Sequence, residues 1–219
     1  MNYEPLQIDI KLSTPLCMGY AWINLDGIIA YLCAREQLGQ DFYLLPTKNP
    51  VKLNLDVPLK KTGKIYHGSV VLMDVDKISI MRIYKRFDEQ NIGHLNTKRK
   101  KIPIGCGFFK SCIINLPYIP ASEVTFYACG DEDRITELFK GLTGLGKSAN
   151  IGFGKIIDIS IKKIKTDYSL VKDGVSMRPI PISMLRKYES TFYTACTFPY
   201  WDKRNVVKCA TPGTCVEMV

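Results

Sequence analysis

The stretch GLTGLGKS, from Gly141 to Ser148, matches the pattern G-x-x-x-x-G-K-[ST] with which P-loop proteins bind nucleotide phosphates. In a P-loop, a strand leads into the glycine turn and a helix follows it, so that the helix amino terminus and the loop amides face the phosphates. Here the apolar patterns predict the reverse order, with a helix before the glycines and a strand after them. We therefore interpret the match as accidental and keep nucleotide hydrolysis through Lys147 and Ser148 only as a third hypothesis.

The glycines still need a reason, because five of them lie between Gly141 and Gly154. Glycine tolerates positive φ angles and lets another backbone approach closely. A glycine loop that carries lysines, placed between a helix and a strand, can hold a phosphodiester backbone through its amides. The alternative is a tight crossover that needs glycine for steric reasons alone. We predict RNA contacts from the following loop residues: Gly144, Gly146, Lys147, Ser148, Asn150, Gly152 and Gly154.

Basic residues gather in a second segment. The chain of 219 residues has 30 Lys and Arg against 21 Asp and Glu, a net charge of +9, which favours a polyanionic partner. The alternative for a basic run is a solvated loop tip. We predict phosphate contacts from the following residues: Lys85, Arg86, Lys98, Arg99, Lys100 and Lys101.

His67 and His94 are the two histidines of the chain. His67 follows Tyr66, and a histidine and a tyrosine near bound RNA could support attack by a 2′-hydroxyl through acid–base chemistry. A metal-independent endoribonuclease is therefore the second hypothesis. We favour a His67 that is hydrogen-bonded in the structure or stacks on a base, so we keep it as an RNA-binding candidate and assign no catalytic residue.

The carboxyl-terminal segment holds a third group of candidates. Tyr200 and Trp201 precede Lys203 and Arg204, and aromatic side chains beside cations suit stacking on an unpaired base with phosphate contacts. The alternative is an aromatic anchor that docks the tail on the core. The eight cysteines include no CxxC pair, and Cys196, Cys209 and Cys215 form a loose group that is only a weak signal for zinc, so we predict no metal site. We also predict no cofactor.

The elements that must position these residues follow from the apolar periodicity. The predicted elements, in chain order, are a strand at Leu6–Leu12, a helix at Leu25–Leu38 capped by Asn24 or Asp26, strands at Ile65–Asp74, Lys77–Tyr84, Ile113–Asn115 and Glu123–Cys129, a helix at Asp131–Leu142 and a strand at Lys155–Ile164. The order strand, helix, strand, strand, helix, strand is that of the ferredoxin-like fold, an α+β class. We predict such a core over residues 1–165, with insertions at about 41–64 and 85–118, and a carboxyl-terminal extension over residues 166–219 packed on it.

No apolar run reaches the roughly 20 residues that span a bilayer, and MNYEPLQIDIKL lacks the features of a signal peptide. We therefore expect a cytoplasmic protein with reduced cysteines and no membrane partner.

Several segments resemble the RAMP superfamily of CRISPR effector proteins, which have ferredoxin-like RNA-recognition cores and a glycine-rich loop before the last strand. GLGKSANIGFGKI resembles that loop, and LDGIIAYL, from Leu25 to Leu32, resembles the first helix of the group. The finer similarity is to the type IV (Csf) version of the subunit that caps the 5′ end of guide RNA. The segments that carry it are YHGSVV, YKRFD, YACGDEDRITELF, FPYWDKR and KCATPG.

The resemblance implies a non-catalytic subunit of a type IV CRISPR ribonucleoprotein. Such a subunit binds the 5′ handle of the guide RNA, contacts a neighbouring backbone subunit and a large subunit, and meets target DNA only through the complex. It also implies that the segment around residues 85–118 forms a projecting thumb, for which Phe108 and Phe109 would be an apolar stem unless they belong to the core.

Overall fold

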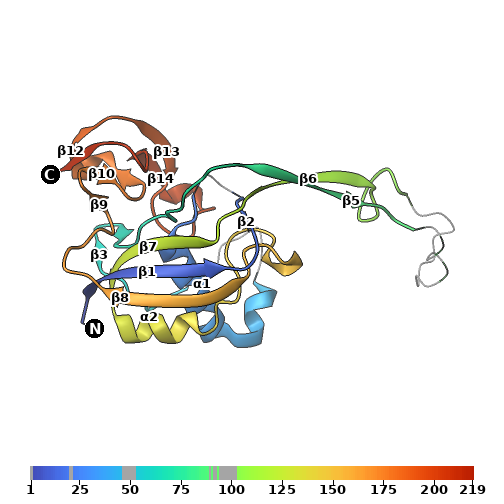
Figure 1. Cartoon of the computed structure of the whole chain (residues 1–219), viewed down its shortest axis with the longest axis horizontal. Helices are drawn as coiled ribbons and strands as arrows, with labels where there is room; N and C mark the ends of the chain where they lie inside the picture. The colour runs from blue at the N-terminus through green and yellow to red at the C-terminus, as the bar shows by residue number, and fades with distance from the viewer. Residues whose placement is uncertain (1, 20–21, 46–52, 89, 91–92, 94–102) are drawn as a thin grey trace.

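The computed structural model describes residues 2–19, 22–45, 53–88, 90, 93 and 103–219. A three-stranded antiparallel sheet lies at the centre (Figure 1), with β1 (Glu4–Leu12) between β7 (Glu123–Gly130) and β8 (Ile156–Lys163). Alternate residues of β1 are apolar, and Leu6, Ile8 and Ile10 are fully buried. One face of the sheet is therefore packed and the other is polar.

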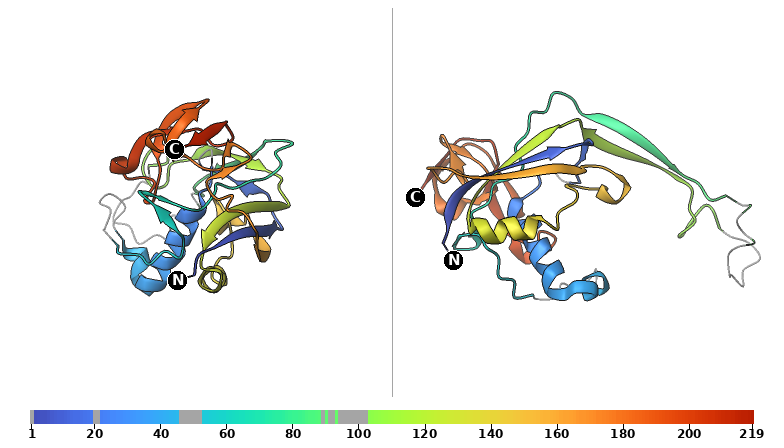
Figure 2. Two further views of the ribbon diagram at one scale, coloured as in Figure 1. Left: turned by 90° about the vertical axis from the view of Figure 1, so that its left-hand side faces the viewer. Right: turned by 60° about the horizontal axis from the view of Figure 1, so that its bottom comes forward.

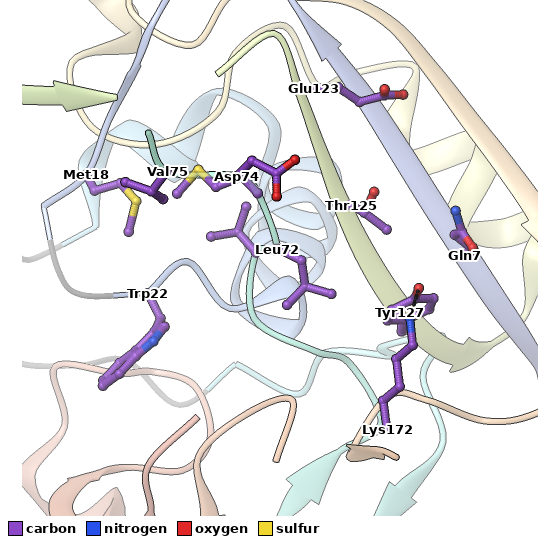
Figure 3. A pocket seen from close by; sticks show the side chains of 12 residues that line it. Gln7, Met18, Trp22, Leu72, Asp74, Val75, Glu123, Thr125, Tyr127 and Lys172 are labelled. Carbon is purple, nitrogen blue, oxygen red and sulfur yellow. Dashed lines mark hydrogen bonds between the residues drawn. The ribbon is translucent and has the colours of Figure 1, made fainter. Parts of the chain in front are cut away.

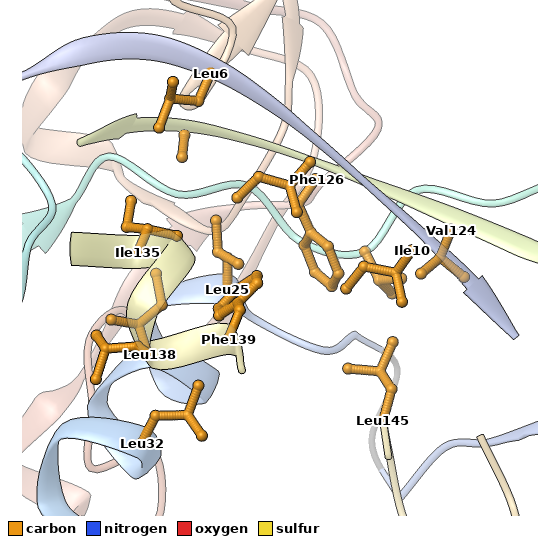
Figure 4. Close-up of a cluster of buried hydrophobic side chains, with 14 of the residues drawn as sticks. Leu6, Ile10, Leu25, Leu32, Val124, Phe126, Ile135, Leu138, Phe139 and Leu145 are labelled. Carbon is orange, nitrogen blue, oxygen red and sulfur yellow. The ribbon is translucent and has the colours of Figure 1, made fainter. Parts of the chain in front are cut away.

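Two helices cover the packed face, as the apolar stripes predicted. α1 (Leu25–Leu38) has the predicted bounds, and α2 (Glu132–Phe139) is shorter than predicted at both ends. Their apolar stripes meet the sheet in one core, in which side chains from α1 and α2 pack beneath Leu6, Ile10 and Phe126 (Figure 4).

The helix caps differ in part from the prediction. Asp131 caps α2, because its carboxylate accepts a hydrogen bond from the amide of Arg134 at 3.2 Å. Asn24 precedes α1 but makes no side-chain capping bond, and the Asp26 carboxylate is buried in a network described below. The predicted capping of α1 by either side chain is therefore wrong.

The predicted strand at Ile65–Asp74 is largely irregular. Only β4 (Ile65–Tyr66) is regular, and it pairs with β3 (Lys61–Thr62). Farther along, Gly68 and Leu72 form isolated bridges to β7, while the amides of Val70 and Val71 bond to segments outside the sheet. The segment thus runs beside β7 without forming a continuous ladder.

A long hairpin projects from the body (Figures 1 and 2), and we call it the projecting hairpin. It consists of β5 (Ser79–Lys85) and β6 (Cys112–Ile119), and β2 (Leu16–Cys17) pairs with the base of β6. Apolar side chains lie exposed along it, including Ile80 at 64% and Tyr84 at 68% of their full exposure.

The segment after β8 folds as a small all-β unit with its own apolar cluster, which includes Ile180, Cys196 and Cys209. Its elements are β9 (Val171–Lys172), β10 (Val175–Ser176), β11 (Ile180–Pro181), β12 (Leu185–Tyr188), β13 (Thr191–Ala195), β14 (Val206–Ala210) and β15 (Val216–Met218), with 3-10 turns at Ile182–Met184 and Lys203–Asn205. The structure describes all of residues 166–219 and finds no α-helix there, so this unit does not repeat the two-helix core. Among the described residues of the whole chain, no helix has the length and apolar character needed to cross a bilayer.

A buried ion pair ties this unit to the core. Arg178 is fully buried, and its guanidinium donates to the carbonyls of Gly68 at 3.0 Å and Cys196 at 2.8 Å, and to the Asp26 carboxylate at 3.4 Å. The Tyr200 hydroxyl donates to the same carboxylate at 2.6 Å. Burial lowers the pKa of Arg178, but the charge of Asp26 outweighs it and keeps the guanidinium protonated.

Candidate nucleic-acid interface

The glycine loop, residues 141–155, joins α2 to β8 and therefore has the predicted order of helix, loop and strand. This is the reverse of a P-loop, so the lysine and serine do not open a helix that follows a strand. Positive φ angles occur at Gly146 (81°), Gly152 (99°) and Gly154 (59°), and also at Ser148 (64°). The glycines thus supply a backbone conformation that other residues rarely adopt.

The close approach in this loop is to the chain's own backbone. A Cβ atom at Gly146 would lie 2.5 Å from the carbonyl oxygen of Cys17, and one at Gly154 would lie 2.0 Å from that of Leu145. A Cβ atom at Gly152, by contrast, would meet no atom within 4 Å. Gly146 and Gly154 are therefore required by internal packing, whereas Gly152 is required only by its φ angle.

The same close approach engages three loop amides, and two of them, those of Lys147 and Gly154, were expected to bind phosphate. The amide of Lys147 donates to Cys17 at 2.7 Å, that of Gly154 donates to Pro15 at 2.8 Å, and that of Leu145 donates to Gly154 at 2.9 Å. These amides are not available to a ligand, so the expected amide cradle is wrong at these positions. The side chains that the loop exposes to solvent include those of Lys147, Asn150 and Lys155.

The glycine loop packs against the base of the projecting hairpin. Phe153 is buried in a cluster with Cys17 of β2 and Leu116 of β6, and its ring centroid lies 6.0 Å from that of Tyr118. Since β2 also pairs with β6, the loop, β2 and the hairpin base form one packed unit. The structure thus joins the loop to the base of the hairpin, whereas the predicted residue Lys85 pairs with Cys112, six residues farther along β5.

Farther along the hairpin, cations and aromatic rings alternate at the surface. Lys85 donates to the carbonyl of Phe108 at 2.8 Å, and its ammonium lies 5.1 Å from the centroid of the Phe108 ring, which is 82% exposed. Phe109 instead packs on Phe87, with ring centroids 4.8 Å apart. Arg86 is exposed beside them.

The sequence analysis missed Tyr84 as a candidate and left Phe108 undecided between stem and core. The alternation of cations and large apolar residues in IYKRF was the signal that could have found Tyr84. The predicted run Lys98, Arg99, Lys100 and Lys101 lies outside the described residues.

His67 lies at the other end of the sheet. Its carbonyl accepts from Cys129, which pairs with Pro5, whereas the glycine loop leads into the end of β8 that pairs with Leu12. Seven residues of β1 separate the two ends, roughly 23 Å at the usual rise of a strand. The structure therefore does not bring His67 to the loop and the hairpin.

Both ring nitrogens of His67 have partners. Nδ1 lies 2.9 Å from the Asp167 carboxylate, and Nε2 lies 2.8 Å from the Thr62 hydroxyl. Burial raises the pKa of Asp167, but hydrogen bonds from His67 and Ser169 outweigh this and lower it to about 2. His67 is thus the hydrogen-bonded structural histidine that the sequence analysis favoured.

The candidates of the carboxyl-terminal segment, Tyr200, Trp201, Lys203 and Arg204, differ in whether their side chains are available to a ligand. The Tyr200 hydroxyl is engaged in the buried network of Arg178, as an anchor would be, and burial raises the pKa of Tyr200 well above its usual value. Trp201 is 66% exposed. Lys203 is exposed, but the charge of Arg204 is compensated by Asp202, whose carboxylate lies 2.6 Å from the guanidinium. Trp201 and Lys203 alone of this group present free surface chemistry.

The thiols offer no metal site in the part of the chain that the structure describes, where no three His, Cys, Asp or Glu side chains converge. Cys196 and Cys209 are both buried and lie side by side, and the hydrogen bond from Cys209 lowers the pKa of Cys196 to about 7. Cys215 is exposed and does not join them.

Comparison with known protein families gives a match, which covers more than half of the chain. The model of the family "CRISPR type IV associated protein Csf3" matches residues 60–212, which include the projecting hairpin, the glycine loop and most of the carboxyl-terminal unit. The chain belongs to the Csf3 family. The predicted resemblance to type IV CRISPR proteins of the Csf group is thereby confirmed, and no curated protein matches this Csf3-family chain.

Among solved structures, the chain is similar to one in the cryo-EM structure of the type III-B Cmr-β complex bound to cognate target RNA. That similarity has 11% identity and a TM-score of 0.41, and covers 74% of this chain and 61% of that one, so the Csf3-family chain spans about three fifths of its length. It is also similar to a chain of the Csm3–Csm4 subcomplex of the type III-A CRISPR–Cas interference complex, with 11% identity and a TM-score of 0.43 over 98% of this chain and 92% of that one.

Proposed function

We propose that this Csf3-family chain is a non-catalytic RNA-binding subunit of a type IV CRISPR ribonucleoprotein, and that it holds the 5′ handle of the guide RNA. The observation that carries the proposal is the packing of the glycine loop on the base of the projecting hairpin through Phe153 and Tyr118. This packing joins the glycine loop to the base of the hairpin, and β5 carries Lys85 six residues farther out from that base.

The core of the proposal is a ferredoxin-like fold of the RAMP type. The strand order β8–β1–β7, two helices on one face and the segment 68–72 beside β7 support this assignment. In such a fold a rigid sheet can carry a loop and a hairpin that contact nucleic acid, with specificity residing in those grafted parts.

The chemistry of the hairpin suits unpaired RNA. An exposed aromatic ring such as that of Phe108 or Tyr84 stacks on any base, and the flanking Lys85 and Arg86 neutralise phosphates. At the hairpin base, Lys147 and Lys155 add phosphate contacts and Asn150 adds hydrogen bonds. The division into stacking and charge is typical of single-stranded recognition.

The surroundings of His67 support a non-catalytic role for the chain. Both of its ring nitrogens are engaged within the protein, and it lies at the far end of the sheet from the loop and hairpin. A general base must reach the 2′-hydroxyl directly or through one water molecule, and this imidazole is already occupied. The endoribonuclease hypothesis therefore ranks second, and nucleotide hydrolysis third.

The proposed partners of the chain are a guide RNA, a neighbouring backbone subunit and a large subunit, and target DNA is bound through the guide. The experiment is a fluorescence anisotropy titration of the full chain with a labelled 5′-handle RNA and with a shuffled RNA of equal length. We expect tighter binding of the handle and intact RNA after incubation. Equal affinity for both RNAs would contradict the handle assignment, and a product ending in a 2′,3′-cyclic phosphate would favour the endoribonuclease.

A further inference from the structure

A groove of about 620 Å³ lies on the face of the sheet opposite the helices, and we call it the outer groove (Figure 3). One wall comes from the outward side chains of β1 and β7, with Gln7, Thr125 and Tyr127. The segment 71–75 runs through it, and Trp22 lies across from Tyr127. The lining of the groove includes neither a residue of the glycine loop nor His67, and no role described so far uses it.

The lining between these walls is mixed, with apolar and aromatic side chains beside a larger polar surface. In Figure 3, Leu72 lies between Trp22 on one side and Tyr127 with Lys172 on the other. Met18 and Met73 add flexible apolar surface. The Trp22 ring packs against Phe192, with ring centroids 5.1 Å apart. A rigid aromatic side chain in a groove is the usual anchor of a protein–protein contact.

The charged side chains that line the outer groove are two carboxylates, Asp74 and Glu123, and one ammonium, Lys172, so the lining has one negative charge in excess. Lys172 is engaged by the groove itself, because its ammonium donates to the Tyr127 hydroxyl at 2.8 Å and lies 4.7 Å from the centroid of that ring. Asp74 and Glu123 are exposed, and neither forms an ion pair with another residue of the described part of the chain.

We propose that the outer groove binds an extended segment of another protein subunit, with an arginine or lysine that pairs with Asp74 and Glu123 and an apolar side chain that packs on Leu72 and Trp22. Charge complementarity selects this occupant, because the carboxylates repel RNA phosphates and attract a cationic side chain. The inference rests on the proposed function in one respect: it requires that the chain works within a protein assembly.

The first experiment reverses the groove charge in the complete complex. Asp74→Lys with Glu123→Lys is compared with the control Asp41→Lys with Asp133→Lys, which changes two exposed carboxylates outside the groove lining. Each tagged variant is co-expressed with the other protein subunits of its system and the guide RNA, and the retained subunits are quantified by mass spectrometry. We expect retention of one subunit to fall by about tenfold or more in the groove variant and by less than about twofold in the control.

A parallel titration separates a protein occupant from RNA. The affinity of each isolated variant for labelled 5′-handle RNA should stay within about threefold of wild type, because neither carboxylate belongs to the loop or hairpin. Unchanged subunit retention in the groove variant would overturn the proposal. A large change in RNA affinity with normal subunit retention would also overturn it, in favour of an RNA occupant.

A second measurement observes the groove without altering its charge. The chain has two tryptophans, so Trp201→Phe leaves Trp22 as the single site for 5-fluorotryptophan. We expect the single ¹⁹F resonance to shift when the protein subunits are added and to stay in place when handle RNA alone is added. A resonance that is unmoved in the assembled complex would contradict the proposal. If wild type fails to bind handle RNA, the proposed function fails, but the subunit retention still decides the groove.

Discussion

Replacing Gly154 by alanine should detach the glycine loop from the base of the projecting hairpin, whereas the same replacement at Gly152 should not. Both residues have positive φ angles, 59° at Gly154 and 99° at Gly152, so each substitution costs about 1–2 kcal/mol in backbone strain. The two positions differ in space, because the new Cβ atom would lie 2.0 Å from the Leu145 carbonyl oxygen at Gly154 and would meet nothing within 4 Å at Gly152.

The clash at Gly154 cannot be relieved by a side-chain rotation, because the opposing atom belongs to the backbone. The loop must move, which breaks the hydrogen bonds from Leu145 to Gly154 at 2.9 Å and from Gly154 to Pro15 at 2.8 Å, at about 1 kcal/mol each. Movement also loosens the burial of Leu145 and Phe153. We therefore expect Gly154→Ala to lower the free energy of unfolding by about 3–4 kcal/mol or more, and Gly152→Ala by about 1–2 kcal/mol.

The assay is urea unfolding of both variants and wild type, followed by anisotropy with handle RNA in urea-free buffer at a temperature where each variant is folded. Gly154→Ala should weaken RNA binding because Lys147 and Phe153 no longer have fixed positions, and Gly152→Ala should bind nearly as wild type does. If the two variants are within about 0.5 kcal/mol of each other in stability, the reasoning that internal packing, and not φ alone, fixes this loop is refuted.

Three other features of the structure can be tested by substitution. Lys85→Ala with Arg86→Ala should reduce the slope of the salt dependence of handle binding by about 0.7 for each phosphate that is no longer neutralised. The control, Arg186→Ala with Lys187→Ala, should leave the slope unchanged. Equal slopes for the two double variants would show that the hairpin is not part of the RNA-binding surface. Arg178→Ala leaves the Asp26 carboxylate buried without its cation, so we expect the free energy of unfolding, measured in urea, to fall by about 3–5 kcal/mol. Adding Asp26→Asn should recover part of this loss. A decrease below about 1 kcal/mol would show that the ion pair does not tie the carboxyl-terminal unit to the core. His67→Ala should leave bound repeat RNA as intact as wild type does on a denaturing gel, and cleavage by wild type that disappears in the variant would establish the endoribonuclease.

Sequence reasoning identified the elements whose signals are local. The strands around Leu6–Leu12 and Lys155–Ile164 alternate clearly between apolar and polar residues, and the structure has them, and the helix at Leu25–Leu38, within about two residues of the predicted bounds. The predicted strand at Ile65–Asp74 failed because its pattern reports burial and not pairing. Residues 67–71 are buried, and the amides of Val70 and Val71 find partners in Met177 of the carboxyl-terminal unit and in Ile23 before α1.

The candidate interface could likewise be predicted only where its signals are local in the sequence. The glycine loop and the basic hairpin segment were evident from composition, but their packing through Phe153 and Tyr118 depends on residues 35 positions apart in chain order and on β2, two residues long. The buried pair of Asp26 and Arg178 was not predicted, because neither residue has a sequence signal for its partner 152 positions away. Long-range polar interactions of this kind appear only when the fold brings the segments together.

The central claim is that this chain holds the 5′ handle of a guide RNA at the glycine loop and projecting hairpin. The most direct test places photoreactive 4-thiouridine at single positions of the handle in the assembled complex, with cross-linked peptides identified by mass spectrometry. We expect cross-links from the handle to peptides of this chain that contain Tyr84–Phe87, Phe108 or Lys147–Lys155. Handle cross-links found on other subunits, with none on these peptides, would contradict the account.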